Sequence, residues 1–227
     1  MISKSIKNLK ENISRTNLTI ESFLSCVAAT SALEEWLNEG KSKPFQEDEM
    51  GKQMKKHIDH AKDSHEGLYE MGFVKIFADF ESFMYEFLVE KYKNYPNSID
   101  NSTKLDIKDI LDEKNIKDLK KKIIDEAATS DSWTIELWEE KLKNKFSISI
   151  FSDKRTRELF LILNEARNII LHSNGRATVK TLKKLHSLNA PSLKHGEKIP
   201  LTNKKLFQSA YSGILTILEN IQHSLKK

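Results

Sequence analysis

The sequence is poor in the residues that break helices or cross-link a chain. Its 227 residues include seven glycines, four prolines and one cysteine, while 31% of them are charged. So few turn-forming residues favour helices over a β-sandwich or barrel, and we expect an all-α protein. A single cysteine excludes an internal disulfide and fits a reducing compartment. Because Cys26 lies in an apolar run, we expect its thiol to be buried.

Long apolar stretches are missing as well. No apolar run approaches the roughly 20 residues that cross a bilayer, and the opening residues, MISKSIKNLKEN, lack the apolar centre of a secretion signal. The prediction is a soluble cytoplasmic protein without membrane contact. The formal net charge of +4 permits a polyanionic partner without requiring one.

Common nucleotide and metal signatures are also missing. There is no glycine-rich phosphate loop, no HExxH motif and no cysteine pair. His57, His60 and His65 fall on one expected helix, but no carboxylate completes an obvious ligand set, so we favour a solvated helix. Lysines at 117 and 120–122 permit phosphate binding, yet a solvated face is again the preferred interpretation. No metal and no cofactor are predicted.

Helical periodicity is what the sequence does contain. Residues 1–15 are polar and expected to fray, and the alternating stretch 146–151 is expected to be an extended connector. Pro44 marks a boundary between an N-terminal helical extension, residues 1–45, and a helical bundle, residues 46–227. Residues 190–202, with two prolines, are the expected mobile loop.

Helices are predicted at about 19–38, 103–128, 159–175, 177–188 and 203–224. Another begins near residue 47 and becomes strongly amphipathic from Phe73. A shorter helix is predicted to start at Ser132-Trp133-Thr134.

The helix over 159–175, LFLILNEARNIILHSNG, has two different faces. Asn174 and Gly175 are expected to end it. Its opposite side is mixed and must be covered by another part of the chain or by a second copy. At about 100° per residue, one stripe faces the core: Leu159, Ile162, Leu163, Ala166 and Ile170. The mixed side holds Phe160, Leu161, Asn164, Glu165, Asn168, Leu171 and His172.

Three residues near the end of this helix can perform phosphate chemistry. Asn168 and His172 are four apart and share a face. Arg167 lies about 140° around the helix from His172, but its long side chain is expected to bend back. Imidazole can donate or accept a proton near neutral pH, and guanidinium binds phosphate as negative charge builds.

The segment Glu165-Ala-Arg-Asn-Ile-Ile-Leu-His-Ser-Asn-Gly resembles the signature helix of the HEPN superfamily. In that helix an Arg, a polar residue directly after it and a His four to six positions on form a metal-independent ribonuclease site. Arg167, Asn168 and His172 match those positions. Residues 141–150 precede the helix as a short strand-like stretch does in many bacterial members. The resemblance runs roughly from Gly67 to the C-terminus and implies a HEPN-like helical bundle, here with an N-terminal helical segment.

The resemblance implies an endoribonuclease that cleaves RNA, such as transfer RNA, leaving a 2′,3′-cyclic phosphate and a 5′-hydroxyl. His172 would be the general acid or base, Arg167 would bind the scissile phosphate and Asn168 would orient one of them. Glu165 would support these residues. Ser173 and Asn174 could touch substrate, although helix capping is the stronger interpretation of both. Stress response, a toxin–antitoxin pair with a cognate inhibitor, and anti-phage defence are the implied settings.

One catalytic histidine per chain is too few for a reaction that uses an acid and a base. HEPN ribonucleases generally work as symmetric dimers, which would bring two copies of His172 and Arg167 into one cleft. The resemblance therefore implies a homodimer with a composite active site. The expected dimer contact consists of Phe160, Leu161, Asn164 and Leu171.

Two other interpretations remain open at this stage. The chain could be a non-catalytic HEPN-like module that binds a nucleotide, an RNA or a partner protein, as an antitoxin-like half of a pair. It could also be purely a dimerisation domain. Arg167 and His172 would then simply bond to neighbouring groups. Toxicity on expression that is lost in His172→Ala would favour the nuclease.

Overall fold

The computed structural model describes residues 2–39, 49–100, 103, 107–111, 115–188, 193–199 and 203–226. They contain no β-strand, only an isolated backbone bridge between Arg176 and Lys198, so the all-α prediction is confirmed. The helices are α1 (Ile2–Glu39), α3 (Glu49–Asn94), the 3-10 helix η1 (Pro96–Ser98), α4 (Ile107–Leu111), α5 (Ile116–Asp131), α6 (Ile135–Phe146), α7 (Lys154–Ser173), α8 (Val179–Ser187) and α9 (Asn203–Ser224).

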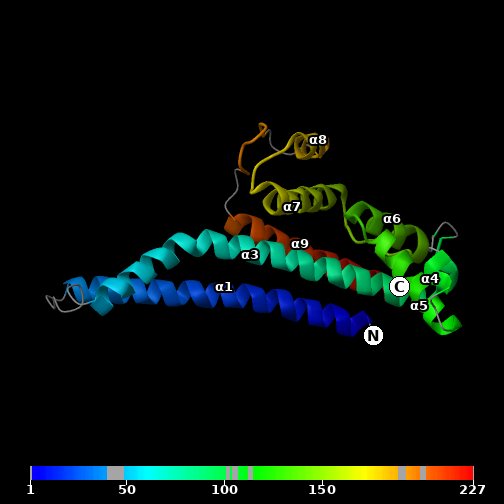
Figure 1. The fold of residues 1–227 in the computed structure, drawn as a ribbon, viewed down its shortest axis with the longest axis horizontal. Helices are drawn as coiled ribbons and strands as arrows, with labels where there is room; N and C mark the ends of the chain where they lie inside the picture. The colour runs from blue at the N-terminus through cyan, green and yellow to red at the C-terminus, as the bar shows by residue number, and fades with distance from the viewer. Residues whose placement is uncertain are drawn as a thin grey trace.

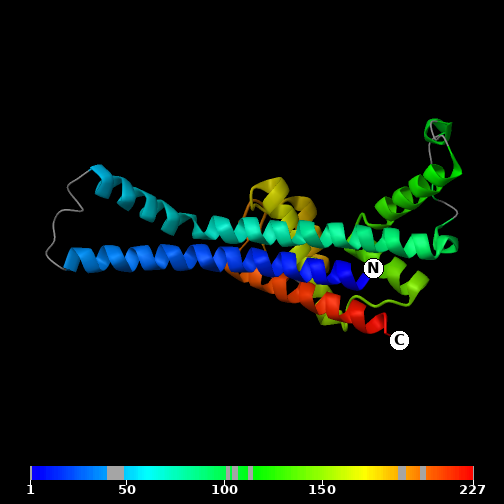
Figure 2. The same cartoon turned by 90° about the horizontal axis from the view of Figure 1, so that it is seen from below.

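Helix α3 is the centre of the arrangement. It packs against α1, α5, α7 and α9. Figures 1 and 2 show α1 and α3 running side by side in opposite directions and projecting together beyond the other helices. Helix α9 lies along this pair, whereas α6 and α7 lie on another side of α3, with α8 stacked outside α7. In the described part of the chain, no helix is long and apolar enough to cross a membrane.

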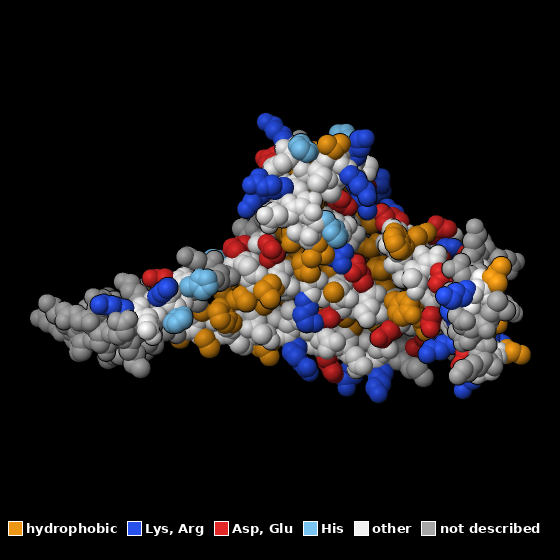
Figure 3. Space-filling model, in the orientation of Figure 1, with side chains coloured by type: hydrophobic (Ala, Val, Ile, Leu, Met, Phe, Trp, Pro, Cys, Tyr) orange, Lys and Arg blue, Asp and Glu red, His pale blue; other side chains and the backbone are white. Residues whose placement is uncertain are grey.

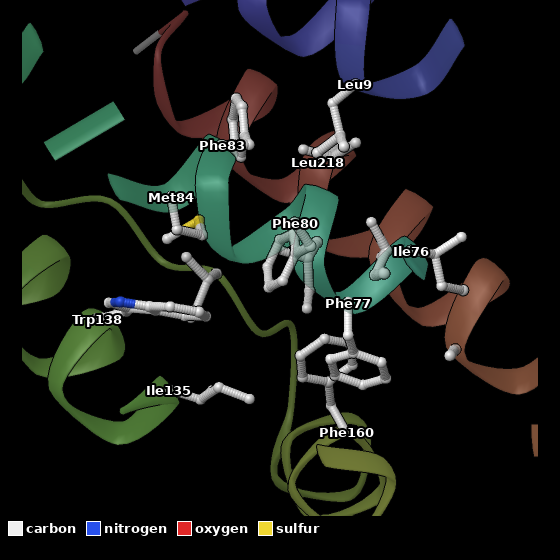
Figure 4. Packing of buried hydrophobic residues seen from close by; sticks show 14 of the residues in the cluster. Leu9, Ile76, Phe77, Phe80, Phe83, Met84, Ile135, Trp138, Phe160 and Leu218 are labelled. Carbon is white, nitrogen blue, oxygen red and sulfur yellow. The ribbon is translucent and has the colours of Figure 1, made fainter. Parts of the chain in front are cut away.

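The periodic stripe predicted for α3 forms the core. Phe80 makes edge-on ring contacts with Phe160 of α7, at a centroid distance of 5.5 Å, and with Trp138 of α6, at 5.6 Å (Figure 4). The stripe therefore holds α6 and α7 on one core. All of its predicted members are at most 1% exposed: Phe73, Ile76, Phe77, Phe80, Met84, Phe87 and Leu88.

The N-terminal residues are helical, and the expectation that residues 1–15 fray is wrong. Ile6, Leu9 and Ile13 are at most 4% exposed and belong to the same core as α3 and α9. Figure 4 shows Leu9 pointing toward Leu218 of α9. The buried stripe of α1 is narrow, with about one apolar residue per turn among polar neighbours. This part of the helix is therefore stabilised by tertiary packing rather than by its own composition.

The expectation that the Cys26 thiol is buried is wrong, because Cys26 lies on an exposed position of α1. Trp133 is 81% exposed, because it lies in the turn between α5 and α6, just before Thr134, the N-cap of α6. Trp138, inside α6, is 2% exposed. The segment 41–45, with the expected domain boundary, and the side chains of Trp36 and Leu37 lie outside the described residues.

The helix expected over 103–128 is interrupted. Helix α4 ends at Leu111, and α5 begins after Asn115, whose side chain accepts a hydrogen bond of 2.9 Å from the backbone N–H of Asp118. Asparagine at an N-cap satisfies an amide that the helix leaves unpaired, so it favours a new start at this position.

Most of the connector predicted over 146–151 lies outside helices, but Phe146 is the last residue of α6 and Ser147 is its left-handed C-cap residue. Ile148 and Ile150 are at most 1% exposed, and Phe146 packs partly buried against the core. The carbonyl of Ile150 accepts a hydrogen bond of 3.1 Å from the Asn220 side chain of α9. The alternating pattern therefore reflects a connector whose Ile148 and Ile150 side chains are buried, and no strand lies beside it among the residues that the structure describes.

A polar cluster ties the ends of α3, α5 and α6 together. The Tyr92 hydroxyl donates a hydrogen bond to Asp131, which lies 3.3 Å from the Lys141 ammonium and 3.5 Å from that of Lys145. Asp100 lies 2.6 Å from Lys141 and 3.0 Å from Lys145. Hydrogen bonds from these two lysines lower the pKa of Asp100, whereas burial and the bond to Asp131 raise that of Tyr92.

Candidate functional site

Helix α7 is fixed at both ends by its own sequence. The carboxylate of Asp153 accepts hydrogen bonds of 2.8 Å from the Thr156 amide and hydroxyl. At the other end, Asn174 adopts a left-handed conformation with φ 49°, Gly175 follows with φ 75°, and the chain turns away. The predicted end of the helix is therefore confirmed. It places Arg167, Asn168 and His172 in the last two turns.

Arg167 is held by an acid from α3. Its Nη2 donates to Oε2 of Glu81 at 2.6 Å, and its Nη1 donates to Oδ1 of Asn168 at 3.1 Å. The Arg167 side chain is 17% exposed, and its Nε is buried and bonds none of the described residues. The guanidinium is thus oriented by two oxygens and keeps further N–H groups for an anion.

Glu81 is the partner that the sequence analysis missed. Burial raises the pKa of its carboxyl above the ordinary value, and the positive charge of Arg167 opposes that shift. The sequence feature that could have identified Glu81 is its position directly after Phe80, at the edge of the buried stripe of α3. A carboxylate there must find a cation or remain in solvent, but the sequence does not say which cation.

His172 is exposed near the C-terminal end of α7. None of the described residues forms a hydrogen bond or ion pair with it. Arg167, about 140° away around the helix, turns toward α3 rather than toward the imidazole. The expectation that its side chain bends back is therefore wrong. Within one chain the structure brings together Arg167, Asn168 and Glu81, but not His172.

Glu165 does not support these residues as expected. It is 5% exposed, and its carboxylate lies 3.6 Å from the ammonium of Lys184 on α8. Lys184 also lies 3.6 Å from Glu136 of α6. Glu165 therefore joins α7 to α8, because a buried carboxylate needs a cation at hand.

The residues that follow His172 cap the helix. The carbonyl of Ser173 accepts a hydrogen bond of 2.9 Å from the Arg176 amide, and the Gly175 amide donates to the carbonyl of Ile169 at 3.1 Å. Asn174 is the left-handed C-cap residue. The interpretation of Ser173 and Asn174 as capping residues is confirmed, and contact with a substrate stays a prediction for both.

The mixed side of α7 is covered mainly by the chain itself. Phe160 is 1% exposed and Leu161 is 2% exposed, so assigning them to a dimer contact is wrong. Phe160 stacks on Phe77 at a centroid distance of 5.4 Å and lies against Gly213 of α9. Leu159, assigned to the core stripe, is instead 51% exposed. Helix α7 is therefore rotated about its axis relative to the predicted orientation, and Phe160 packs between α3 and α9.

Two of the proposed contact residues remain accessible. Leu171 is 46% exposed and Asn164 is partly buried. Together with Leu159, they leave apolar and polar groups on the outside of α7.

As for metals, no group of three or more His, Cys, Asp or Glu among the described residues is arranged to hold an ion.

Comparison with protein-family models, curated proteins and solved structures gave no match.

Proposed function

We propose that this chain is a metal-independent endoribonuclease that works as a homodimer, on the strength of its resemblance to the HEPN signature helix. The observation that carries the proposal is the arrangement of the last two turns of α7. Glu81 and Asn168 orient the Arg167 guanidinium, and an exposed histidine follows one turn later. These are the groups needed to hold a phosphate and to move a proton.

The proposed reaction uses the RNA's own nucleophile. The 2′-oxygen attacks the adjacent phosphorus and forms a P–O bond, while the P–O5′ bond breaks. One His172 accepts the proton of the 2′-hydroxyl, and a second donates a proton to the departing 5′-oxygen. Arg167 binds the non-bridging oxygens, whose negative charge increases in the transition state. The products are a 2′,3′-cyclic phosphate and a 5′-hydroxyl.

A second copy supplies what one chain lacks. In one chain Arg167 is directed toward α3 while His172 is exposed on another side of α7. If the α7 helices of two copies faced each other across a two-fold axis, two copies of each residue would come into one cleft. Leu171, Asn164 and Leu159 are the accessible residues of α7 that such a contact would cover.

The proposed setting is cytoplasmic RNA, in stress response, in defence against phage or as a toxin restrained by an inhibitor protein. Transfer RNA is the substrate to test first. A small, conditional nuclease of this kind would be harmful when unrestrained, so toxicity on expression is an inexpensive first observation.

One observation favours a second candidate function. Arg167 is only 17% exposed and already has a carboxylate partner, so it could serve as a tie between α3 and α7. The chain would then be a non-catalytic module that binds RNA or a partner protein. A purely structural dimerisation domain predicts neither cleavage nor RNA binding.

The test is cleavage of total RNA and transfer RNA by the purified chain in excess EDTA, with the product ends determined. Wild type should cleave, whereas Arg167→Ala and His172→Ala should not, although both remain folded and dimeric. Arg155→Ala, exposed on the same helix, and His223→Ala, exposed on α9, are matched controls that should keep activity. An inert wild type that still binds RNA would replace the nuclease with the binding module.

A further inference from the structure

The segment that follows α7 is strongly basic. From residue 176 to residue 198 the sequence has six lysines and arginines and one acid, Glu197. Lys184 is the cation that faces Glu136 and Glu165. We call the described residues 172–188 and 193–199 the basic lobe. The other five cations are exposed: Arg176, Lys180, Lys183, Lys194 and Lys198.

The backbone joins the two parts of the basic lobe. The Ala177 amide donates to the carbonyl of Glu197 at 2.9 Å, and the Gly196 amide donates to the carbonyl of Ala177 at 2.8 Å. Arg176 and Lys198 form the isolated bridge, and the guanidinium of Arg176 donates to the carbonyl of Gly196 at 3.0 Å. Lys194 and Lys198 are therefore kept next to the start of α8.

Helix α8 presents two further cations on one side. Its N-terminus is fixed by a reciprocal capping box between Thr178 and Thr181, and Leu185 anchors its inner face at 5% exposure. Lys180 and Lys183 are three apart, so they lie one turn above the other. Both are exposed.

The exposed cations of the basic lobe have no acidic partners in the described part of the chain. No ion pair forms there to Arg176, Lys180, Lys183, Lys194 or Lys198. Glu197, the one acid, accepts a hydrogen bond of 2.8 Å from the backbone amide of Lys194. Figure 3 shows Lys and Arg side chains on both sides of the projection formed around α8. Such a concentration of one charge sign attracts a polyanion.

The basic lobe begins at His172, in the last turn of α7. Helix α8 packs on α7, and the ammonium of Lys184 on α8 lies 3.6 Å from the carboxylate of Glu165 on α7. Asn174 and Gly175 make the turn between them. His172, which is exposed, therefore lies four residues before Arg176, the first exposed cation of the basic lobe.

We propose that the basic lobe binds the phosphate backbone of an RNA strand on the nucleotides next to the cleaved linkage. This inference rests on the proposed ribonuclease function, because cleavage requires the strand to pass His172. Lysine and arginine on flexible stems suit a backbone whose phosphates differ in spacing from one RNA to another. They bind without reading the base sequence.

The lysine run of α5 is the competing site. It has exposed Lys117, Lys120 and Lys121, but Asp118, Asp125 and Glu126 are interleaved with them. The mixed signs reduce its attraction for a polyanion. Lys117 and Lys120 have the same spacing as Lys180 and Lys183, so they provide a control with the same charge change on another helix.

The experiment measures binding of a short fluorescein-labelled single-stranded RNA to the full chain in excess EDTA over a series of NaCl concentrations. His172→Ala is used as the background so that the RNA stays intact. Lys180→Gln with Lys183→Gln should make the slope of log affinity against log salt shallower by about 1.4, at about 0.7 per lost contact. Lys117→Gln with Lys120→Gln should leave the slope unchanged. Circular dichroism verifies that each variant is folded.

Each alternative outcome has a defined meaning. Equal slopes for the two double variants, a loss confined to the α5 variant, or no RNA binding would overturn the inference. Competition by polyglutamate as strong as that by unlabelled RNA would also overturn it and point to an acidic protein partner. Binding that depends on Lys180 and Lys183, in a chain whose wild type never cleaves, would support the basic lobe while the proposed catalysis fails.

Discussion

Arg167 and Glu81 are 86 residues apart in the chain, yet the Nη2 of one lies 2.6 Å from the Oε2 of the other. The ion pair joins the last turns of α7 to the C-terminal third of α3. It fixes the direction of the one guanidinium that the proposed reaction needs. It also explains why Arg167 does not fold back toward His172, since a half-buried carboxylate attracts it more strongly than a solvent-exposed imidazole.

Glu81→Gln should lower kcat for RNA cleavage about tenfold, equivalent to about 1.4 kcal/mol. The amide keeps an acceptor for Arg167 but loses the charge that orients the guanidinium. The affinity for RNA should not fall, because Glu81 repels rather than binds phosphate. Single-turnover cleavage and anisotropy measure the two quantities, and Glu86→Gln, exposed on the same helix, is the control. An unchanged kcat would mean that Glu81 does not position Arg167.

Phe160→Ala should destabilise the folded chain by about 3–5 kcal/mol, because it removes a ring packed against Phe77 and Phe80. Leu159→Ala, one residue earlier and 51% exposed, should change the free energy of unfolding by less than about 1 kcal/mol. Urea unfolding followed by circular dichroism gives both values. If Leu159→Ala were the more damaging substitution, the rotation of α7 described above would be wrong.

Ile13→Ala should lower the free energy of unfolding by about 2–5 kcal/mol, since Ile13 is fully buried between α1 and the other core helices. Asn12→Ala, exposed beside it, should stay within about 0.5 kcal/mol of wild type. Thermal unfolding distinguishes them. A frayed N-terminus predicts that both substitutions are silent.

Asp131→Ala should destabilise by about 1–3 kcal/mol, because the buried Tyr92 hydroxyl loses its acceptor while Lys141 and Lys145 keep Asp100 as a partner. Glu126→Ala, exposed on the same helix, serves as the control and should be close to neutral. The measurement is denaturant unfolding at low and high salt. A loss for Asp131→Ala no larger than that of the control would show that the cluster contributes nothing.

Asp153 should contribute to the acid sensitivity of the fold. Hydrogen bonds from Thr156 and Ser152 lower the pKa of its carboxyl from 3.8 to about 2. The folded state therefore binds this proton more weakly than the unfolded state. The stabilisation is complete above the unfolded value and is lost as pH falls through the folded value. Asp153→Asn, which keeps a cap acceptor but does not titrate, should show a shallower fall in unfolding midpoint over this range. Parallel curves would contradict the assignment.

The sequence by itself determined where most helices lie. The stripe of α3, the Thr134 start of α6, the Asn174-Gly175 end of α7 and the course of α9 all follow from local rules of periodicity and capping. The same local rules placed Arg167, Asn168 and His172 within two turns of one helix. These features need only neighbouring residues, so they can be predicted before any tertiary contact is known.

Tertiary structure decided which faces are covered. Phe160 is buried and Leu159 exposed because α3 and α9 approach α7 from one particular side, and no local pattern contains that direction. The same holds for the pairing of Arg167 with Glu81 and of Glu165 with Lys184. A long charged side chain on a helix can reach several partners, and only the packing of whole helices selects one of them.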